Sequence, residues 1–324
     1  MNKTMKNILF GTGIVAGTVA TAGVISYKIT KKLVAIALDR KEEKTIDSPA
    51  RKHPENPEMK AFIKLREEAA QKLEQSSCET VEIAAHDGVN LVGHWQEGKD
   101  AKRIIIAVHG WRSSWTKDFG LIADFFRENN CHVLYIEQRG QNNSGGEYMG
   151  FGLTERYDCL DWIDWVNHQE FEGLPIYLCG ISMGASTVLM TAGFELPQNV
   201  HGVIADCGYT SPHAIWKHVV EEGLHLRYDE MMSSIAEDIC RSKIQVGPKD
   251  YSCTYAMETC KVPVLFVHGT DDDFVPVEMT YENYKACASP KRLLIVPGAG
   301  HGMSYVLDKA GYEQAVKMFW KEFD

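Results

Sequence analysis

The chain has 324 residues, with 34 lysines and arginines against 44 aspartates and glutamates, a formal net charge of −10. A hydrophobic fraction of 44% is typical of globular proteins and excludes a largely disordered chain. The acidic balance argues against a nucleic-acid-binding protein, because such a protein needs a basic surface to displace counterions from phosphates. The length fits about two domains, or one large α/β domain with additional segments.

Nine cysteines are scattered along the chain without a C-x-x-C pair. This pattern fits neither a zinc framework nor a small disulfide scaffold. We expect free, mostly buried thiols, which favour a reducing compartment. The sequence also contains no metal-ligand cluster and no glycine-rich phosphate loop, so we expect neither a metal nor an organic cofactor.

The N-terminus contains an uncharged 20-residue stretch, Ile8–Tyr27. At 1.5 Å per residue, a helix of this length just spans a hydrocarbon core of about 30 Å. We therefore expect residues 1–38 to form a single-pass membrane anchor with a basic flank. More basic residues follow the stretch than precede it, which favours a cytoplasmic catalytic domain. The basic residues that follow are Lys28, Lys31, Lys32, Arg40 and Lys41.

A cleaved signal peptide is the alternative interpretation of the same stretch. Lys3 and Lys6 give it a positive start, and Ala20-Thr21-Ala22 is an A-x-A cleavage site. Cleavage would place the rest of the chain outside the cytoplasm, where the free cysteines would meet an oxidising environment.

Two segments precede the main domain. Residues 39–60 are charged and contain three prolines, which predicts a solvated linker. Residues 61–78 lie mostly within a helical pattern at Met59–Gln75, whose apolar positions share one face and predict a helix that packs on the domain behind it. We expect residues 79–324 to form the catalytic domain.

Strand and helix patterns alternate through that domain. A hairpin with a D-G turn at Asp87-Gly88 comes first, and unbroken apolar runs typical of strands buried on both faces follow. The expected strands are Thr80–Ala84, Asn90–Trp95, Arg103–His109, His132–Ile136, Pro175–Cys179, Val200–Ala205, Val262–Val267 and Lys291–Val296. The expected helices are Phe119–Asn129, Thr154–Gln169, Met183–Glu195, Val277–Ala288 and Asp308–Phe323. This order predicts an α/β fold with a mostly parallel sheet of about eight strands and helices on both faces.

The spacing is interrupted once, between the strand that ends near Asp206 and the strand that begins at Val262. A crossover needs about a dozen residues, so the surplus predicts a helical lid at residues 211–261. Such an insertion at the carboxyl end of the sheet would cover a site there. From its apolar composition we expect these lid residues to contact substrate: Trp216, Tyr228, Met231 and Met232.

The motif Gly180-Ile181-Ser182-Met183-Gly184 directly follows an expected strand and opens an expected helix. In this context G-x-S-x-G predicts a nucleophilic serine on a turn too tight for larger residues at the glycine positions. A serine hydroxyl needs a base, and the base needs an orienting acid. Both should follow the serine in the order acid, then histidine.

His301 lies between glycines after the last expected strand, where it can reach across to Ser182. The acid should follow the strand before it, in the stretch Asp271-Asp272-Asp273. We expect His109 and His268 to brace loops through hydrogen bonds.

An oxyanion hole requires two backbone N–H donors. We assign one to Met183, which follows the nucleophile, and the other to Trp111, with Arg112 as the alternative. The Trp111 indole should also form a wall of the acyl pocket.

Together these motifs resemble the α/β-hydrolase superfamily of serine hydrolases, and most closely the membrane-anchored, Bem46-like bacterial hydrolases. The resemblance covers the chain from about Glu79 onward. It implies that Asp272 is the acid, in the pattern H-G-x-x-D-x-x-V-P, and that Asp271 and Asp273 are turn residues. Asp206, at the end of the preceding expected strand, is an alternative acid that occurs in some relatives. One departure is Asn142, which stands where relatives often have glycine. The motifs that carry the resemblance are His109-Gly110-Trp111, Gln138-Arg139, Gly180–Gly184, Asp206–Ser211, Val262–Gly269 and Ala299-Gly300-His301.

Ser182, Asp272 and His301 as nucleophile, acid and base predict a serine hydrolase that cleaves esters, with thioesters as an alternative, of apolar acyl or aryl groups through an acyl-enzyme. The expected partners are a small or lipid-like ester and a membrane, not nucleic acid. The alternatives are a serine peptidase or amidase, and a membrane-tethered hydrolase fold that only binds or scaffolds.

Overall fold

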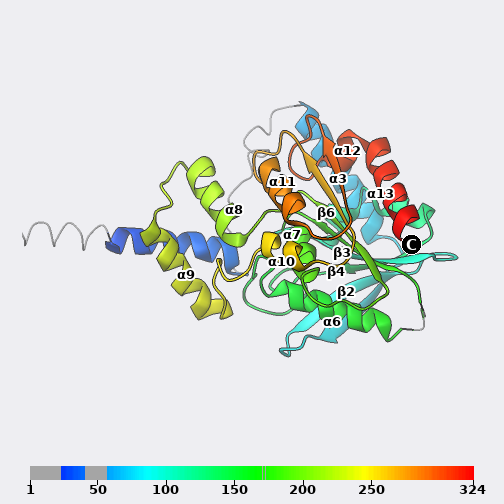
Figure 1. Ribbon diagram of the computed structural model, residues 1–324, viewed down its shortest axis with the longest axis horizontal. Helices are drawn as coiled ribbons and strands as arrows, with labels where there is room; N and C mark the ends of the chain where they lie inside the picture. The colour runs from blue at the N-terminus through cyan, green and yellow to red at the C-terminus, as the bar shows by residue number, and fades with distance from the viewer. Residues whose placement is uncertain (1–22, 41–56, 170, 172) are drawn as a thin grey trace, which may run out of the picture.

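The computed structural model describes residues 23–40, 57–169, 171 and 173–324 (Figure 1). Its centre is an eight-stranded sheet in the order β1-β2-β4-β3-β5-β6-β7-β8. β1 and β2 are joined to the sheet by antiparallel pairing, and all the pairs from β4 to β8 are parallel. The strands are β1 (Glu79–Ala84), β2 (Asn90–Gln96), β3 (Arg103–Val108), β4 (Cys131–Ile136), β5 (Ile176–Ile181), β6 (Val200–Asp206), β7 (Val264–Gly269) and β8 (Lys291–Val296). The expected eight-stranded, mostly parallel sheet is confirmed.

Helices cover both faces of this sheet, because side chains alternate between the faces along each strand. In β3, Ile104 and Ile106 contact one hydrophobic cluster, whereas Ile105 and Ala107 contact another. The first face packs against α6 (Glu155–Asn167), α7 (Met183–Thr191), α10 (Cys253–Thr259) and α11 (Val277–Ala286). The second packs against α3 (Pro57–Glu74), α4 (Trp115–Phe119), α5 (Ala123–Glu128) and α13 (Lys309–Phe323).

The helix expected at Phe119–Asn129 corresponds to α5, and a division after Phe119 separates it from the short helix α4. Gly120 lies at the division, and a Cβ there would come within 2.7 Å of the Ala69 backbone on α3. The glycine thus permits a close approach of α3, which is held further by hydrogen bonds from Arg66 to the Lys117 carbonyl at 2.9 Å and to Asp118 at 2.5 Å.

The lid region contains several short elements between β6 and β7. They are α8 (Pro212–His218), the π-helical turn η1 (Val219–Gly223), α9 (Glu230–Ile244) and α10. The side chains of Ser211, Asp229 and Ser252 each accept a hydrogen bond from the first turn of the helix that follows, which explains where α8, α9 and α10 begin. In Figure 1, α8 and α9 extend away from the sheet.

The N-terminal helix, residues 23–38, lies beside α8 and α9 (Figure 1). The sequence predicted the end of a membrane anchor and a basic flank here. In the structure, Val34 and Leu38 of this segment are buried in the main hydrophobic cluster. Leu33 packs on the lid. The helix is therefore part of the catalytic domain's packing rather than a segment separated from it.

Most of the expected membrane span, Ile8–Tyr27, lies outside the described residues. Within the part of the chain that the structure describes, no helix has both the length and the apolarity to cross a bilayer. Membrane attachment, the choice between anchor and signal peptide, and the side of the membrane stay predictions.

Candidate active site

Ser182 lies on a sharp turn between β5 and α7. Its φ of 56° and ψ of −119° are unusual for a residue with a side chain, and such strain is typical of functional sites. The turn also explains the two flanking glycines. A Cβ on Gly180 would collide with the Gly184 backbone, and one on Gly184 would collide with the Val108 carbonyl.

Three side chains are joined by two consecutive hydrogen bonds. His301 Nε2 lies 2.9 Å from Ser182 Oγ, and His301 Nδ1 lies 2.7 Å from Asp272 Oδ2. His301 comes from the loop after β8 and Asp272 from the loop after β7. The carboxyl ends of parallel strands meet at one edge of the sheet, which is why residues over a hundred positions apart converge. This arrangement suits proton transfer from the serine hydroxyl to the imidazole.

Asp272 is held by four donors. Its Oδ1 accepts hydrogen bonds from the Phe274 and Val275 backbone N–H groups at 3.0 and 2.9 Å. Its Oδ2 lies 3.1 Å from His268 Nε2, in addition to its contact with His301. His268 Nε2 also faces the Val275 carbonyl at 2.8 Å. Since both neighbours of that nitrogen are acceptors, we assign the proton to Nε2, whose N–H is shared between the Val275 carbonyl and the Asp272 carboxylate.

The pKa values of the pair favour a charged carboxylate beside the imidazole. Burial alone would raise the pKa of Asp272, but the charge of His301 and the hydrogen bonds from His268 and His301 hold it below its ordinary value. Burial alone would lower the pKa of His301, whereas the Asp272 carboxylate raises it well above the ordinary histidine value. Cys207 also lies beside His301, but burial raises the pKa of its thiol to about 11, so it is neutral at pH 7.

The other candidate acids lie elsewhere. Asp206 accepts a hydrogen bond from Ser304 Oγ at 3.2 Å, and burial raises the pKa of its carboxyl to about 6. Asp271 accepts from Thr270 Oγ1 at 2.7 Å. The Asp273 carbonyl faces His218 Nε2 at 3.4 Å. The contact with His301 Nδ1 at 2.7 Å is made by Asp272.

The candidate oxyanion donors lie beside Ser182. Met183 is the first residue of α7, and both Met183 and Trp111 line the same pocket as the serine. The Arg112 backbone N–H donates to Gln141 Oε1 at 2.6 Å, which leaves Trp111 as the better second donor. The loop that carries Trp111 is braced by His109. Its Nδ1 faces the Gly110 carbonyl at 2.8 Å, and its Nε2 accepts from the Gln138 N–H at 3.1 Å.

Asn142, which replaces the glycine of many relatives, adopts a φ of 49°. Asparagine tolerates this left-handed region better than most residues. Its side chain also donates to the Ser113 carbonyl at 3.0 Å, so the substitution is accommodated and ties two loops together.

Ser182 opens into an apolar pocket with about 750 Å³ of space not filled by protein atoms. Of the four lid residues expected to contact substrate, Trp216, Tyr228 and Met232 line this pocket. Met231 does not, and its side chain is 47% exposed. Met231 and Met232 are neighbours on α9, and adjacent helical residues point in different directions. The remaining lining residues are Thr30, Leu33, Val34, Ala37, Trp111, Phe151, Met183, Tyr209, Ile215, Val219, Val220, Ala236, Phe274 and Val275.

The chain is similar to known proteins in sequence and in structure. Residues 99–240 match the family described as serine aminopeptidase, S33 (Hydrolase_4). The chain is 26% identical over 235 residues to uncharacterized protein YqkD of Bacillus subtilis (strain 168), which covers 72% of this chain and 75% of YqkD. The Pyrococcus furiosus esterase Pf2001 has a similar structure, with a TM-score of 0.64, 20% identity, and coverage of 78% of this chain and 93% of that one.

The chain belongs to the α/β-hydrolase superfamily. A second similar structure is Est1E from Butyrivibrio proteoclasticus with ferulic acid bound, at a TM-score of 0.60 and 20% identity, covering 75% of this chain and 98% of Est1E. These likenesses establish the fold, and one fold hosts many chemistries. The finer resemblance to Bem46-like hydrolases stays a prediction.

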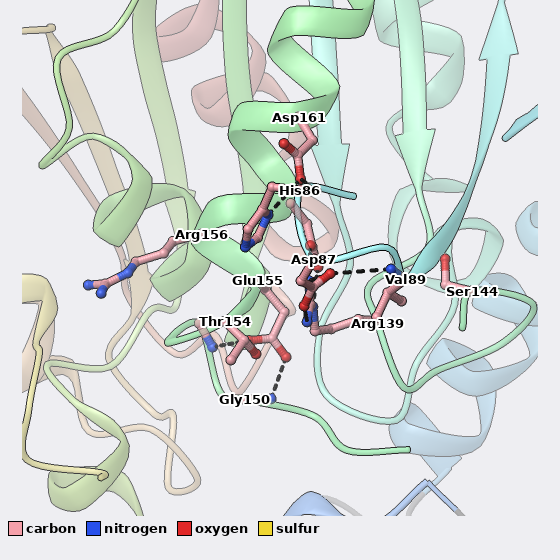
Figure 2. A network of polar contacts seen from close by, with 12 residues as sticks. His86, Asp87, Val89, Arg139, Ser144, Gly150, Thr154, Glu155, Arg156 and Asp161 are labelled. Atoms are coloured by element: carbon pink, nitrogen blue, oxygen red, sulfur yellow. Dashed lines mark hydrogen bonds and ion pairs between the residues drawn. The ribbon is translucent and has the colours of Figure 1, made fainter. Parts of the chain in front are cut away.

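Sequence reasoning about this α/β hydrolase missed one pocket wall, Phe151. It lies between Gly150 and Gly152 with a φ of 54°, and its ring meets Trp216 edge-on at 5.3 Å. The buried Glu155 carboxylate fixes this loop, since it accepts hydrogen bonds from the Gly150 and Gly152 N–H groups at 2.5 and 2.9 Å (Figure 2). An aromatic residue between two glycines after a strand was the available signal.

Arg139 anchors the start of the same loop (Figure 2). Its guanidinium bridges Asp158 Oδ2 at 2.7 Å and Asp87 Oδ2 at 2.7 Å, and both Arg139 and Asp158 are buried. His86, Asp158 and Asp161 also lie close enough together to share a cation. However, the bidentate Arg139 already neutralises Asp158, so this group serves as an ion-pair brace.

Sequence reasoning also missed the N-terminal helix, from which four side chains reach the pocket: Thr30, Leu33, Val34 and Ala37. No local pattern could have revealed this, because the contact joins segments more than a hundred residues apart. The sequence interpretation treated these residues as the flank of a membrane anchor and expected no site residue among them.

Proposed function

We propose that this α/β hydrolase is a serine hydrolase that cleaves carboxylic esters, thioesters included, of apolar acyl or aryl groups. The observation that carries the proposal is that His301 contacts both Ser182 and Asp272 at hydrogen-bond distance, and that Ser182 lines an apolar pocket.

In the proposed reaction, Ser182 Oγ attacks the carbonyl carbon while His301 Nε2 takes the hydroxyl proton. The Asp272 carboxylate stabilises the resulting imidazolium. The Met183 and Trp111 N–H groups receive the negative charge that develops on the carbonyl oxygen. His301 then donates its proton to the leaving alcohol or thiol, which leaves an acyl group on Ser182. Water attacks this acyl-enzyme, His301 takes a proton from the water and returns it to Ser182, and the acid departs.

An aminopeptidase is the second candidate, because of the family match over residues 99–240. An aminopeptidase must bind a protonated amine, for which a carboxylate is the natural partner. The described residues that line the pocket include no aspartate or glutamate. This lining favours an uncharged acyl group over an amino-terminal residue.

Turnover of p-nitrophenyl esters and of aminoacyl p-nitroanilides, measured side by side, tests the proposal. We expect turnover of esters and at least about a thousandfold loss in both Ser182→Ala and His301→Ala, with the double variant little worse than either. Preferential cleavage of the aminoacyl substrates would support the peptidase. A wild-type protein without either activity and without fluorophosphonate labelling would favour a hydrolase fold that only binds or scaffolds.

A further inference from the structure

The N-terminal helix buries one stripe of side chains, and part of that stripe, Thr30 and Val34, lines the active-site pocket. Thr30, Val34 and Leu38, spaced four residues apart, are buried. Val24 and Ile25 on the outer side are more than half exposed. A helix with apolar residues at this spacing packs one face and leaves the other free. The pocket therefore has a wall that lies far from the catalytic residues in sequence.

Polar contacts fix the C-terminal end of this helix near Ser182. The Trp111 indole N–H donates to the Ala37 carbonyl at 2.9 Å. The Arg112 guanidinium donates to the Ile36 carbonyl at 2.9 Å, and a positive charge at the end of a helix is favourable. Because Trp111 also lines the pocket with Ser182, the Ala37 end of the helix is the catalytic end.

The other end of the wall meets the lid. Leu33 packs against a small cluster formed by Val220, Tyr228 and Met232. At the Ala37 end, an ion pair between Asp39 and Lys243 of α9, at 2.8 Å, also joins the helix to the lid. The pocket thus follows the helix from Ala37 to Thr30. Seven residues of helix correspond to about 10 Å.

We propose that the N-terminal helix sets the acyl-chain length of the substrate, and that the substrates are esters of linear acyl chains of medium length. The inference rests on the proposed ester hydrolysis and adds the substrate class. An extended chain of about eight carbons matches the length from Ala37 to Thr30, since each single bond of about 1.5 Å advances such a chain by slightly less than its own length. The Thr30 hydroxyl donates to the Ser26 carbonyl at 2.8 Å and so presents no unpaired polar group to the chain.

Two variants of the full chain alter the wall, and a third on the same helix serves as the matched control. Thr30→Phe fills the far end of the pocket, and Leu33→Ala enlarges it. Ile25→Phe adds the same ring as the first variant on the exposed side, where Ile25 is 52% exposed. The readout is kcat/KM for p-nitrophenyl butyrate, octanoate and dodecanoate.

In Thr30→Phe we expect the octanoate-to-butyrate ratio to fall by at least about tenfold, because a pocket that rejects even one methylene discriminates by about this factor. Leu33→Ala should raise the dodecanoate-to-octanoate ratio by several-fold, and Ile25→Phe should match the wild type. If Thr30→Phe does not fold, the dodecanoate-to-octanoate ratio of Leu33→Ala tests the inference. Ratios that coincide in all folded variants would overturn the inference.

Failure of the proposed function gives a different result. In that case the wild type neither hydrolyses any of the esters nor reacts with a fluorophosphonate. Binding of octanoic acid, followed by the fluorescence of the pocket tryptophans Trp111 and Trp216, then tests the wall alone. Weaker binding of octanoic acid in Thr30→Phe than in Ile25→Phe would support the N-terminal helix as a wall of the acyl pocket, and equal binding would overturn that role.

Discussion

His268 Nε2 lies 3.1 Å from Asp272 Oδ2, the same oxygen that His301 Nδ1 contacts at 2.7 Å. One carboxylate oxygen is thus held between two histidines, of which only His301 reaches Ser182. His268 is fully buried, and Thr280 Oγ1 lies 2.6 Å from its Nδ1. This geometry makes His268 a positioning residue for the acid, beyond the loop bracing that its place after a strand predicted.

His268→Phe removes the hydrogen bond to Asp272, and we expect kcat to fall about 10- to 100-fold with little change in KM, because a hydrogen bond to a charged group is worth about 1.5–3 kcal/mol. His268→Gln places an amide donor near the same position and should restore part of the loss. Steady-state kinetics of both folded variants would check this. Equal losses in the two variants would indicate that His268 only fills space.

The pH profile should report the Asp272–His301 pair. His301 must be neutral to accept the Ser182 proton, and its pKa is raised by the Asp272 carboxylate. Activity should therefore be lost as the pH falls through a value above the ordinary histidine pKa of about 6.5. In Asp272→Asn the carboxylate is gone, so the acidic limb of kcat/KM should move to lower pH while kcat falls by several orders of magnitude.

Asp206→Asn is the matched control for that experiment. Asp206 is buried near the site but bonds to Ser304. In this variant we expect the acidic limb of the kcat/KM pH profile to stay near that of the wild type. A larger loss of kcat in Asp206→Asn than in Asp272→Asn would mean that the acid follows β6 instead of β7.

Glu155→Ala should loosen the pocket without touching the catalytic residues. It leaves the Gly150 and Gly152 N–H groups without their acceptor, and each buried unpaired group costs about 1–3 kcal/mol. We expect a lower melting temperature and a raised KM for aryl esters, because Phe151 loses its support. The measurements are thermal unfolding and ester kinetics. An unchanged melting temperature would show that the loop does not depend on this carboxylate.

The position at which the chain is shortened should decide stability. A chain that begins at Gly23 keeps the N-terminal helix, whereas one that begins at Met59 loses the buried side chains of Val34 and Leu38. Burial of each contributes about 1.5–3 kcal/mol, so we expect the shorter chain to be less stable by about 3–6 kcal/mol. Urea unfolding of the two would compare them directly. Equal midpoints would show that the charged linker separates the helix from the domain, as its composition alone suggested.

Local features of the sequence were sufficient to predict the sheet and to select Ser182 and His301, which the structure brings within 2.9 Å of each other. The strand before Ser182 and the glycines around it act within a few residues of each other, and the edge of a parallel sheet has only a few places for an acid and a histidine. The position of Asp272 within its run of three aspartates required the family resemblance.

The pocket walls were harder to predict because they depend on packing between distant segments. Thr30 and Val34 lie in the segment interpreted as the flank of a membrane anchor, and nothing in their local sequence indicates that they line a pocket together with residues of α8 and α9. Met231 was misplaced for a related reason, since only the rotation of α9 decides which of two neighbouring methionines faces inward.

The identity of the nucleophile is the central claim, and peptide mass spectrometry after fluorophosphonate treatment tests it most directly. We predict one phosphonyl adduct on Ser182 and none on Ser186, which is buried one turn further along α7. The adduct should be absent in Ser182→Ala and strongly slowed in His301→Ala. An adduct on any other serine, or persistent labelling in Ser182→Ala, would contradict the account.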